Sequence, residues 1–181
     1  TEITQLLNLS QKSLEQQHGC LLALSNACFY RIIYYIQNNK NEEWTKFVKS
    51  REYTELIDVL VKLLNDQKSL LQLASLKGLS LLGCFALPFE DVKEENAENY
   101  THSKIYVMNT VGQLLKSSHS KQKVREEAAV CLGYLSIGDS IFFSKRVINH
   151  FLDMKRMTKD AALHISIARA LGFIFSGDEH L

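Results

Sequence analysis

The sequence predicts an all-α fold in which antiparallel helix pairs stack into a solenoid. A stretch at 124–139 begins with charged residues, becomes small and apolar, and stops at Gly138-Asp139. The same shape returns 39 residues later at 164–178. A period of about 40 residues carried by helical segments is typical of an α-solenoid. The single proline and the 8 glycines among 181 residues also favour helix, because both residue types destabilise helix interiors.

A three-residue motif marks each predicted repeat: a small residue, a leucine, and then serine or glycine. It occurs at 23–25, 78–80, 131–133 and 170–172. Small side chains let neighbouring helices approach closely, so we expect Gly133 to lie where two helices touch. Four copies in register predict an α-solenoid of HEAT-type antiparallel helix pairs. A polar residue precedes each motif leucine by seven positions, namely Gln17, Gln72, Arg125 and His164.

The first half of the chain is expected to hold one long helix and one helix pair. Ser13 is suited to cap a helix over 14–37, because its hydroxyl can accept a backbone N–H at the helix start. The polar segment 38–51 is expected to be a connector with one short helical turn. Apolar residues then recur at i, i+3, i+4 and i+7, which predicts a helix over 53–64. A nearly apolar helix at 69–85 returns and should lie in the more buried layer.

Two further helix pairs are expected after an acidic loop. The loop at 87–102 is expected to be solvated, with a contact to a basic partner as the alternative. Helices at 104–116 and 121–137 form the next pair, and helices at 140–157 and 159–175 form the last. The expected organisation is one solenoid segment cut from a longer protein. It consists of a first motif helix at about 13–37, helix pairs at 53–86, 103–138 and 140–177, and the loop at 87–102.

Composition restricts the function classes. A net charge of +1 provides no overall field towards nucleic acid or an anionic membrane, so binding to nucleic acid is not expected. Arg31 and Lys77 interrupt the longest apolar runs, so membrane insertion is not expected either. The cysteines lie in apolar helical patterns without a C-x-x-C pair, which indicates buried, reduced thiols and cytoplasmic and nuclear localisation. They are Cys20, Cys28, Cys84 and Cys131.

No residues have the spacing of a catalytic, cofactor-binding or metal site. The six histidines are scattered without an H-E-x-x-H pair, and His164 is expected to be structural rather than a metal ligand. Cys84 and Cys131 have no histidine beside them in sequence to act as a base. We therefore predict no enzyme activity, no cofactor and no metal.

Two clusters remain after this search. A basic cluster is followed at once by Glu126 and Glu127, and this cancellation argues against a phosphate-binding groove. An aromatic cluster surrounds Arg31 in the first helix; burial in the core is expected, with reception of a partner as the alternative. The basic cluster is Lys116, Lys121, Lys123 and Arg125, and the aromatic one is Phe29, Tyr30, Tyr34 and Tyr35.

Several stretches resemble a known family. They are the run L-E-Q-Q-H-G-C-L-L-A-L at 14–24, V-R-E-E-A at 124–128, L-G-Y at 132–134, I-G-D at 137–139 and Phe143. In this order they resemble the large proteasome-associated HEAT-repeat scaffold, the proteasome adapter and scaffold protein family. The likeness runs from Leu14 to Gly177. At Arg169 the chain departs from the family pattern, which tends to have glutamate there.

The resemblance implies a scaffold that binds proteasome subunits and links them to other proteins. The alternative is a HEAT-repeat scaffold of another system, such as nuclear transport or vesicle traffic. An enzyme with an unrecognised site is a third possibility, which a pocket with convergent polar side chains would favour.

Overall fold

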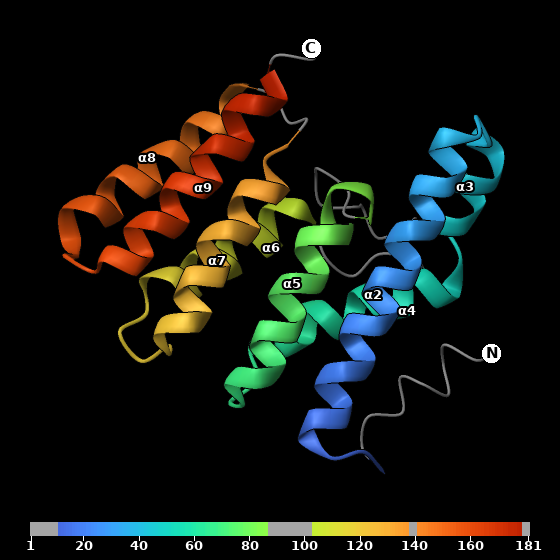
Figure 1. The fold of residues 1–181 in the computed structure, drawn as a ribbon, viewed down its shortest axis with the longest axis horizontal. Helices are drawn as coiled ribbons and strands as arrows, with labels where there is room; N and C mark the ends of the chain where they lie inside the picture. The colour runs from blue at the N-terminus through green and yellow to red at the C-terminus, as the bar shows by residue number, and fades with distance from the viewer. Residues whose placement is uncertain (1–10, 87–102, 138–140, 179–181) are drawn as a thin grey trace.

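A computed structural model describes residues 11–86, 103–137 and 141–178, and the regular elements there are α-helices (Figure 1). The acidic loop and the Gly138-Asp139 stop lie outside these ranges. In chain order the helices are α2 (Leu14–Gln37), α3 (Asn41–Val48), α4 (Arg51–Leu63), α5 (Ser69–Ala86), α6 (Lys104–Lys116), α7 (Gln122–Leu135), α8 (Ile141–Met157) and α9 (Ala161–Asp178).

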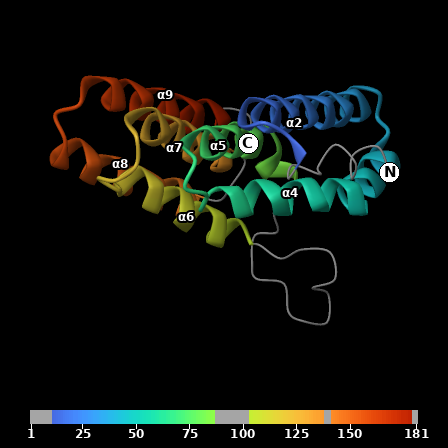
Figure 2. The same ribbon diagram turned by 90° about the horizontal axis from the view of Figure 1, so that it is seen from below.

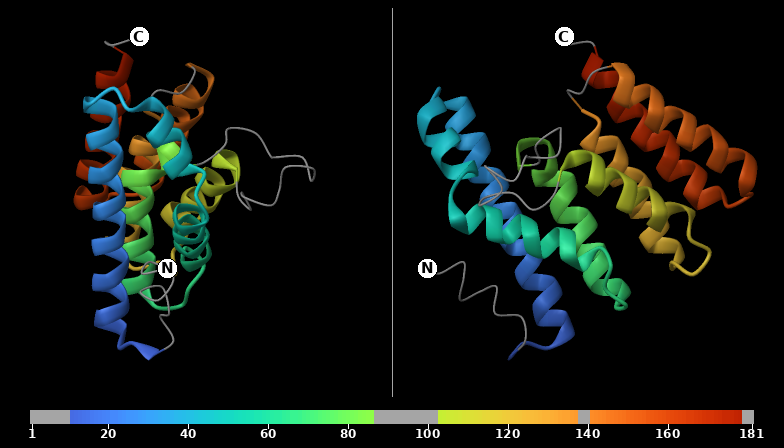
Figure 3. Two further views of the ribbon diagram at one scale, coloured as in Figure 1. Left: turned by 90° about the vertical axis from the view of Figure 1, so that its right-hand side faces the viewer. Right: turned by 180° about the vertical axis from the view of Figure 1, so that it is seen from behind.

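The helices form two layers. The first layer consists of α2, α5, α7 and α9, each packed against the next, and the second layer consists of α4, α6 and α8 (Figure 2). Each second-layer helix pairs with the first-layer helix that follows it in the chain. Views from the side and from behind show these pairs succeeding one another along the molecule (Figure 3). The predicted all-α solenoid of antiparallel pairs is therefore confirmed.

Leucines dominate the core of the stack. Leu60 of α4, Leu79 of α5 and Leu115 of α6 are fully buried. Burying a leucine side chain contributes roughly 1.5–3 kcal/mol relative to leaving it in water. The apolar stripe of each helix therefore holds the pair together, while the small residues decide how closely the pairs stack.

Neighbouring first-layer helices meet at the repeat motif. A Cβ atom on Gly133 of α7 would lie 2.7 Å from the Cα of Ala170 on α9. A Cβ atom on Gly78 of α5 would lie 2.7 Å from the Oγ of Ser25 on α2. In both contacts the third residue of one motif faces the first residue of the next. The prediction that Gly133 lies where two helices touch is confirmed.

The same register joins the two central helices. The hydroxyl of Ser80, the third residue of its motif, contacts the thiol of Cys131, the first residue of the next. Burial raises the pKa of the Cys131 thiol to about 12, because the thiolate would lose its hydration. All three junctions of the layer therefore use the same pair of motif positions.

The polar residue seven positions before each motif leucine binds a backbone carbonyl. Carbonyls at a helix C-terminus have no partner within the helix, so a side-chain donor satisfies them. Three of the four acceptors lie at the end of the preceding helix or directly after it, which fixes the turn within a pair. The pairs are Gln17 with Lys12 at 2.9 Å, Gln72 with Leu64 at 3.2 Å, Arg125 with Leu115 at 3.1 Å and His164 with Thr158 at 3.0 Å.

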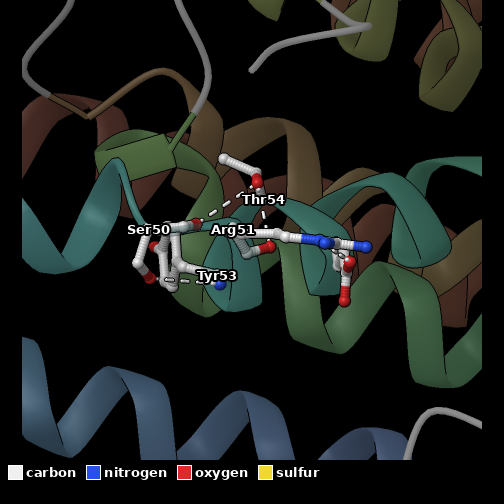
Figure 4. Close-up of polar contacts among 5 residues, drawn as sticks. Ser50, Arg51, Tyr53 and Thr54 are labelled. Atoms are coloured by element: carbon white, nitrogen blue, oxygen red, sulfur yellow. Dashed lines mark hydrogen bonds and ion pairs between the residues drawn. The ribbon is translucent and has the colours of Figure 1, made fainter. Parts of the chain in front are cut away.

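The start of α4 shows how a pair is anchored (Figure 4). The Ser50 Oγ accepts a hydrogen bond of 3.4 Å from the backbone N–H of Tyr53. The Thr54 hydroxyl lies 3.2 Å from the Ser50 carbonyl and 3.0 Å from the Arg51 carbonyl. Tyr53 itself is fully buried, and its hydroxyl donates to the Leu82 carbonyl of α5 at 3.5 Å. The helix cap and the core contact therefore involve the same short segment.

The connector at 38–51 is more ordered than predicted. It contains α3, a helix of 8 residues that packs on α2 and α4. Phe47 and Val48 are buried, and the Phe47 ring centroid lies 5.2 Å from that of Tyr53. The prediction of a single turn was wrong because these two apolar residues, together with Trp44, give the segment one side that can be buried.

One helix of the described part, α2, is long and apolar enough to cross a membrane by length and composition. This differs from the prediction, in which Arg31 ruled out such a segment. Only 28% of the most apolar 18-residue stretch of α2 is buried inside the molecule. Its buried residues include Leu21, Leu24 and Ile32, and α5 packs along the same helix.

Candidate binding surfaces

Within the ranges that the structure describes, no group of three or more histidine, cysteine or acidic residues is placed to hold a metal ion. The His164 Nε2 lies 3.0 Å from the Thr158 carbonyl oxygen, a contact that supports the expected structural role. Cys131 is buried in the stack, whereas Cys84 is exposed on α5. Burial was therefore predicted correctly for Cys131 and wrongly for Cys84.

Charges alternate across the first layer. The carboxyl of Glu127 on α7 lies within the electrostatic reach of Lys77 on α5 and Arg169 on α9. Burial raises the pKa of Glu127, and the two cations act in the opposite direction. Arg169, where the chain departs from the family pattern, thus faces an opposite charge. The geometry also shows that Glu127 belongs to the first layer and does not neutralise the lysines at the end of α6.

A groove of about 450 Å³ runs between α6 and α8 in the second layer, and we call it the α6–α8 groove. Leu132 of α7 and Val147 and His150 of α8 line its floor and far wall. Gly112 lies opposite His150, and a Cβ atom there would still be 3.6 Å from the His150 Nε2. The near wall is a stripe along nearly the whole of α6: Ile105, Met108, Asn109, Gly112, Gln113 and Lys116.

Six exposed cations gather where α6 and α8 end and α7 and α9 begin, and we call this region the basic end. A hydrogen bond of 3.4 Å from the Gln122 side chain to the Asp160 carboxylate joins the two turns. Asp160 also caps α9 by accepting from the backbone N–H groups of Ala162 and Leu163. Among the described residues, no hydrogen bond or ion pair engages these six side chains. They are Lys116, Lys121, Lys123, Lys155, Arg156 and Lys159.

The exposed side of α2 is aromatic and basic. Tyr30 and Tyr34 are 68% and 51% exposed, so the prediction that the aromatic cluster is core was wrong for these two residues. Arg31 lies over the Phe47 ring at 4.5 Å from its centroid, and Lys40 lies over the Tyr34 ring at 5.0 Å. Lys40 therefore supports an exposed ring of α2, whereas Arg31 covers a buried ring of α3.

The sequence predicted three members of the basic end, namely Lys116, Lys121 and Lys123, but Arg125 was wrongly grouped with them. Arg125 uses its guanidinium on the Leu115 carbonyl, whereas Lys155, Arg156 and Lys159 come from the next repeat. The 39-residue period was the available signal, because it places the turn after α8 beside the turn after α6. The groove itself left no signal in the sequence, since its stripe reads as an ordinary amphipathic helix.

Comparison with curated proteins relates the chain to a much longer one. No protein-family model matches the chain, and no solved structure matches it. The chain is 34% identical over 190 aligned residues to the proteasome-associated protein ECM29 homolog of Drosophila melanogaster, and the match covers 94% of the chain. This chain is a divergent relative of that protein. The resemblance to a large proteasome-associated protein is thereby confirmed.

The match covers 10% of the Drosophila ECM29 homolog. The relationship therefore concerns one stretch of that protein and assigns no role to a particular residue. For this chain the geometry supplies two surfaces that are open to contact. One is the α6–α8 groove with the basic end, and the other is the aromatic side of α2.

Proposed function

We propose that this chain is a non-catalytic scaffold segment, a HEAT-type solenoid that binds the proteasome and connects it to other proteins. The observation that carries the proposal is the 34% identity over 94% of the chain to a protein that is itself named as proteasome-associated. The regular stack supports the same function. Helix pairs in series offer an extended surface, and a scaffold needs such a surface more than an enclosed site.

Cytoplasmic and nuclear localisation is part of this proposal. The four cysteines are not joined in disulfides. Reduced, partly buried thiols are typical of proteins that reside in those compartments.

A binding experiment with purified proteasomes tests the proposal. The chain would be immobilised, incubated with intact proteasomes, washed, and assayed for retained peptidase activity. We expect retention on the native chain and none on a chain unfolded by heat before use. If the native chain remains folded on the support and retains no proteasomes, the scaffold assignment for this segment is wrong.

A further inference from the structure

The α6–α8 groove and the basic end lie next to each other in the second layer. Lys116 belongs to both, because it closes the groove stripe and stands at the last turn of α6. The stripe from Ile105 to Lys116 extends about 17 Å along α6 at 1.5 Å per residue. The surface therefore consists of a channel about three helical turns long, lined by both apolar and polar side chains, that opens onto exposed positive charge.

Favourable interactions with helix dipoles explain the positions of only three of the six cations in the basic end. Lys116, Lys155 and Arg156 stand in the last turns of α6 and α8, where cations interact favourably with the helix dipole. Lys121 and Lys123 stand at the start of α7, where the same dipole disfavours cations. Lys159 stands two residues before α9, where the dipole of that helix also disfavours a cation. These three charges cost stability where they are, and an external anionic partner would offset that cost.

The acidic groups nearby reduce the charge of this surface but do not cancel it, since Glu126, Asp153 and Asp160 stand against six cations. Asp160 is held by the α9 backbone and by Gln122, and Glu127 lies among Lys77 and Arg169 in the first layer. On α8, Asp153 is the one acidic residue, and Lys155 and Arg156 stand in the last turn of the same helix. α6 carries no acidic residue at all.

We propose that the α6–α8 groove and the basic end together bind an acidic amphipathic segment of a partner protein. Its apolar side chains enter the groove over Met108, Leu132 and Val147, and its carboxylates pair with the cations of the basic end. The apolar part of the groove lining favours a peptide over nucleic acid, because a phosphate backbone has no apolar side chains to bury there. This site goes beyond the attachment to proteasomes and stands whether or not the proteasome supplies the segment.

The test measures binding of a fluorescein-labelled peptide to the full chain by fluorescence anisotropy. The peptide carries leucines one helical turn apart and a glutamate-rich end. We expect saturable binding that weakens with added salt, since paired surface charges are screened. Replacing the peptide leucines by serine, or its glutamates by glutamine, should each weaken binding about tenfold or more. Equal binding by all three peptides would overturn the proposal without requiring any protein variant.

Charge variants place the site on the molecule. The double variant Lys155→Glu, Arg156→Glu should weaken peptide binding about tenfold or more. The matched control is Lys46→Glu on α3 with Lys49→Glu directly after it, which changes the net charge equally at exposed positions at the opposite end of the molecule (Figure 1). The control should bind like the original chain. Equal weakening by both pairs would mean a diffuse charge effect and would refute the assigned site.

Filling the groove tests its apolar part. Gly112→Leu should weaken binding about tenfold, whereas Gly112→Ala should leave it unchanged, because an added Cβ meets His150 only at ordinary contact distance. A thermal melt verifies that both variants are folded.

A single-stranded DNA oligonucleotide tests the competing ligand class, nucleic acid. The peptide proposal is wrong if two results occur together: the chain binds the oligonucleotide more tightly than it binds the peptide, and the Lys155→Glu, Arg156→Glu variant no longer binds the oligonucleotide. The surface would then be a nucleic-acid site.

Discussion

Gly133 of α7 lies so close to Ala170 of α9 that a Cβ atom on the glycine would sit 2.7 Å from the Ala170 Cα and 2.9 Å from its carbonyl oxygen. The obstacle is backbone, which cannot rotate away as a side-chain tip can. The third position of one motif and the first position of the next therefore determine the spacing of two repeats. The same positions meet at Ser25 with Gly78 and at Ser80 with Cys131.

Gly133→Ala should lower the free energy of unfolding by about 1–3 kcal/mol, because the new methyl group forces α7 and α9 apart. Gly172 is the matched control. It occupies the same motif position in α9, and a Cβ atom there would meet nothing within 4 Å. Gly172→Ala should therefore be neutral or stabilising by up to about 1 kcal/mol through helix propensity. Urea unfolding followed by circular dichroism measures both. Equal effects of the two substitutions would contradict the repeat contact.

Arg125→Met should destabilise the chain by about 1–2 kcal/mol. The guanidinium Nε donates to the Leu115 carbonyl at 3.1 Å, and its loss leaves a partly buried carbonyl without this donor. Lys123→Met, two residues earlier and exposed, removes the same charge without removing a bond and should have little effect. Thermal melts of the two variants at equal ionic strength provide the comparison. A larger loss in the Lys123 variant would show that net charge, and not the carbonyl bond, matters here.

Glu127→Gln should stabilise the chain at neutral pH. Burial raises the pKa of Glu127 in the folded state above its unfolded value, so ionised Glu127 disfavours folding at every pH above the raised pKa. This penalty disappears as the pH falls through the raised pKa to the unfolded one, because the carboxyl is then protonated in both states. The stability advantage of the glutamine variant should shrink over the same range.

Melting temperatures of the Glu127 variant and the original chain, measured from neutral to acidic pH, check this sign. Arg169→Gln is the opposing control. It removes a cation that favours the ionised carboxylate, so it should raise the pKa of Glu127 further and lower stability at neutral pH. A Glu127→Gln variant that is less stable than the original chain at neutral pH, by a difference that shrinks on acidification, would mean that Glu127 is stabilised as an anion.

The period and the local helix signals predicted most of the fold. Ser13 caps α2 and accepts from the Gln16 N–H as its position suggested, and the expected span of α6 matches the observed one. These features depend on neighbours in sequence or on an exact repeat, and both can be read from one chain. The polar residues before each motif were also visible, although their carbonyl partners emerge only when the turns close.

What the sequence left undetermined depends on which side of a helix meets another. Tyr30 and Tyr34 are aromatic and read as core, yet α5 packs on a different side of α2. Glu127 follows the basic cluster in sequence but faces the first layer, so of the two glutamates expected to offset the lysines only Glu126 is left to do so. Composition along the chain cannot distinguish these directions, because residues one position apart on a helix point about 100° away from each other.

Thiol labelling tests the burial of the motif cysteine directly. Burial raises the pKa of Cys131 to about 12 and that of Cys28 to about 11, so neither forms an appreciable thiolate in the folded chain. Cys84 is exposed. A maleimide reagent at mildly alkaline pH should therefore modify Cys84 first and leave Cys28 and Cys131 unmodified until the chain is unfolded, because the thiolate is the reacting species.

Mass spectrometry of the digested, labelled protein reads each site separately. Gly133→Ala, which should loosen the contact between α7 and α9, should speed the labelling of Cys131 on the same helix more than that of Cys28 on α2. Cys131 reacts only when the stack opens, so its rate reports on the junction between repeats. Labelling of Cys131 as fast as Cys84 in the original chain would show that the α5–α7 junction opens freely, and the close motif register would then be wrong.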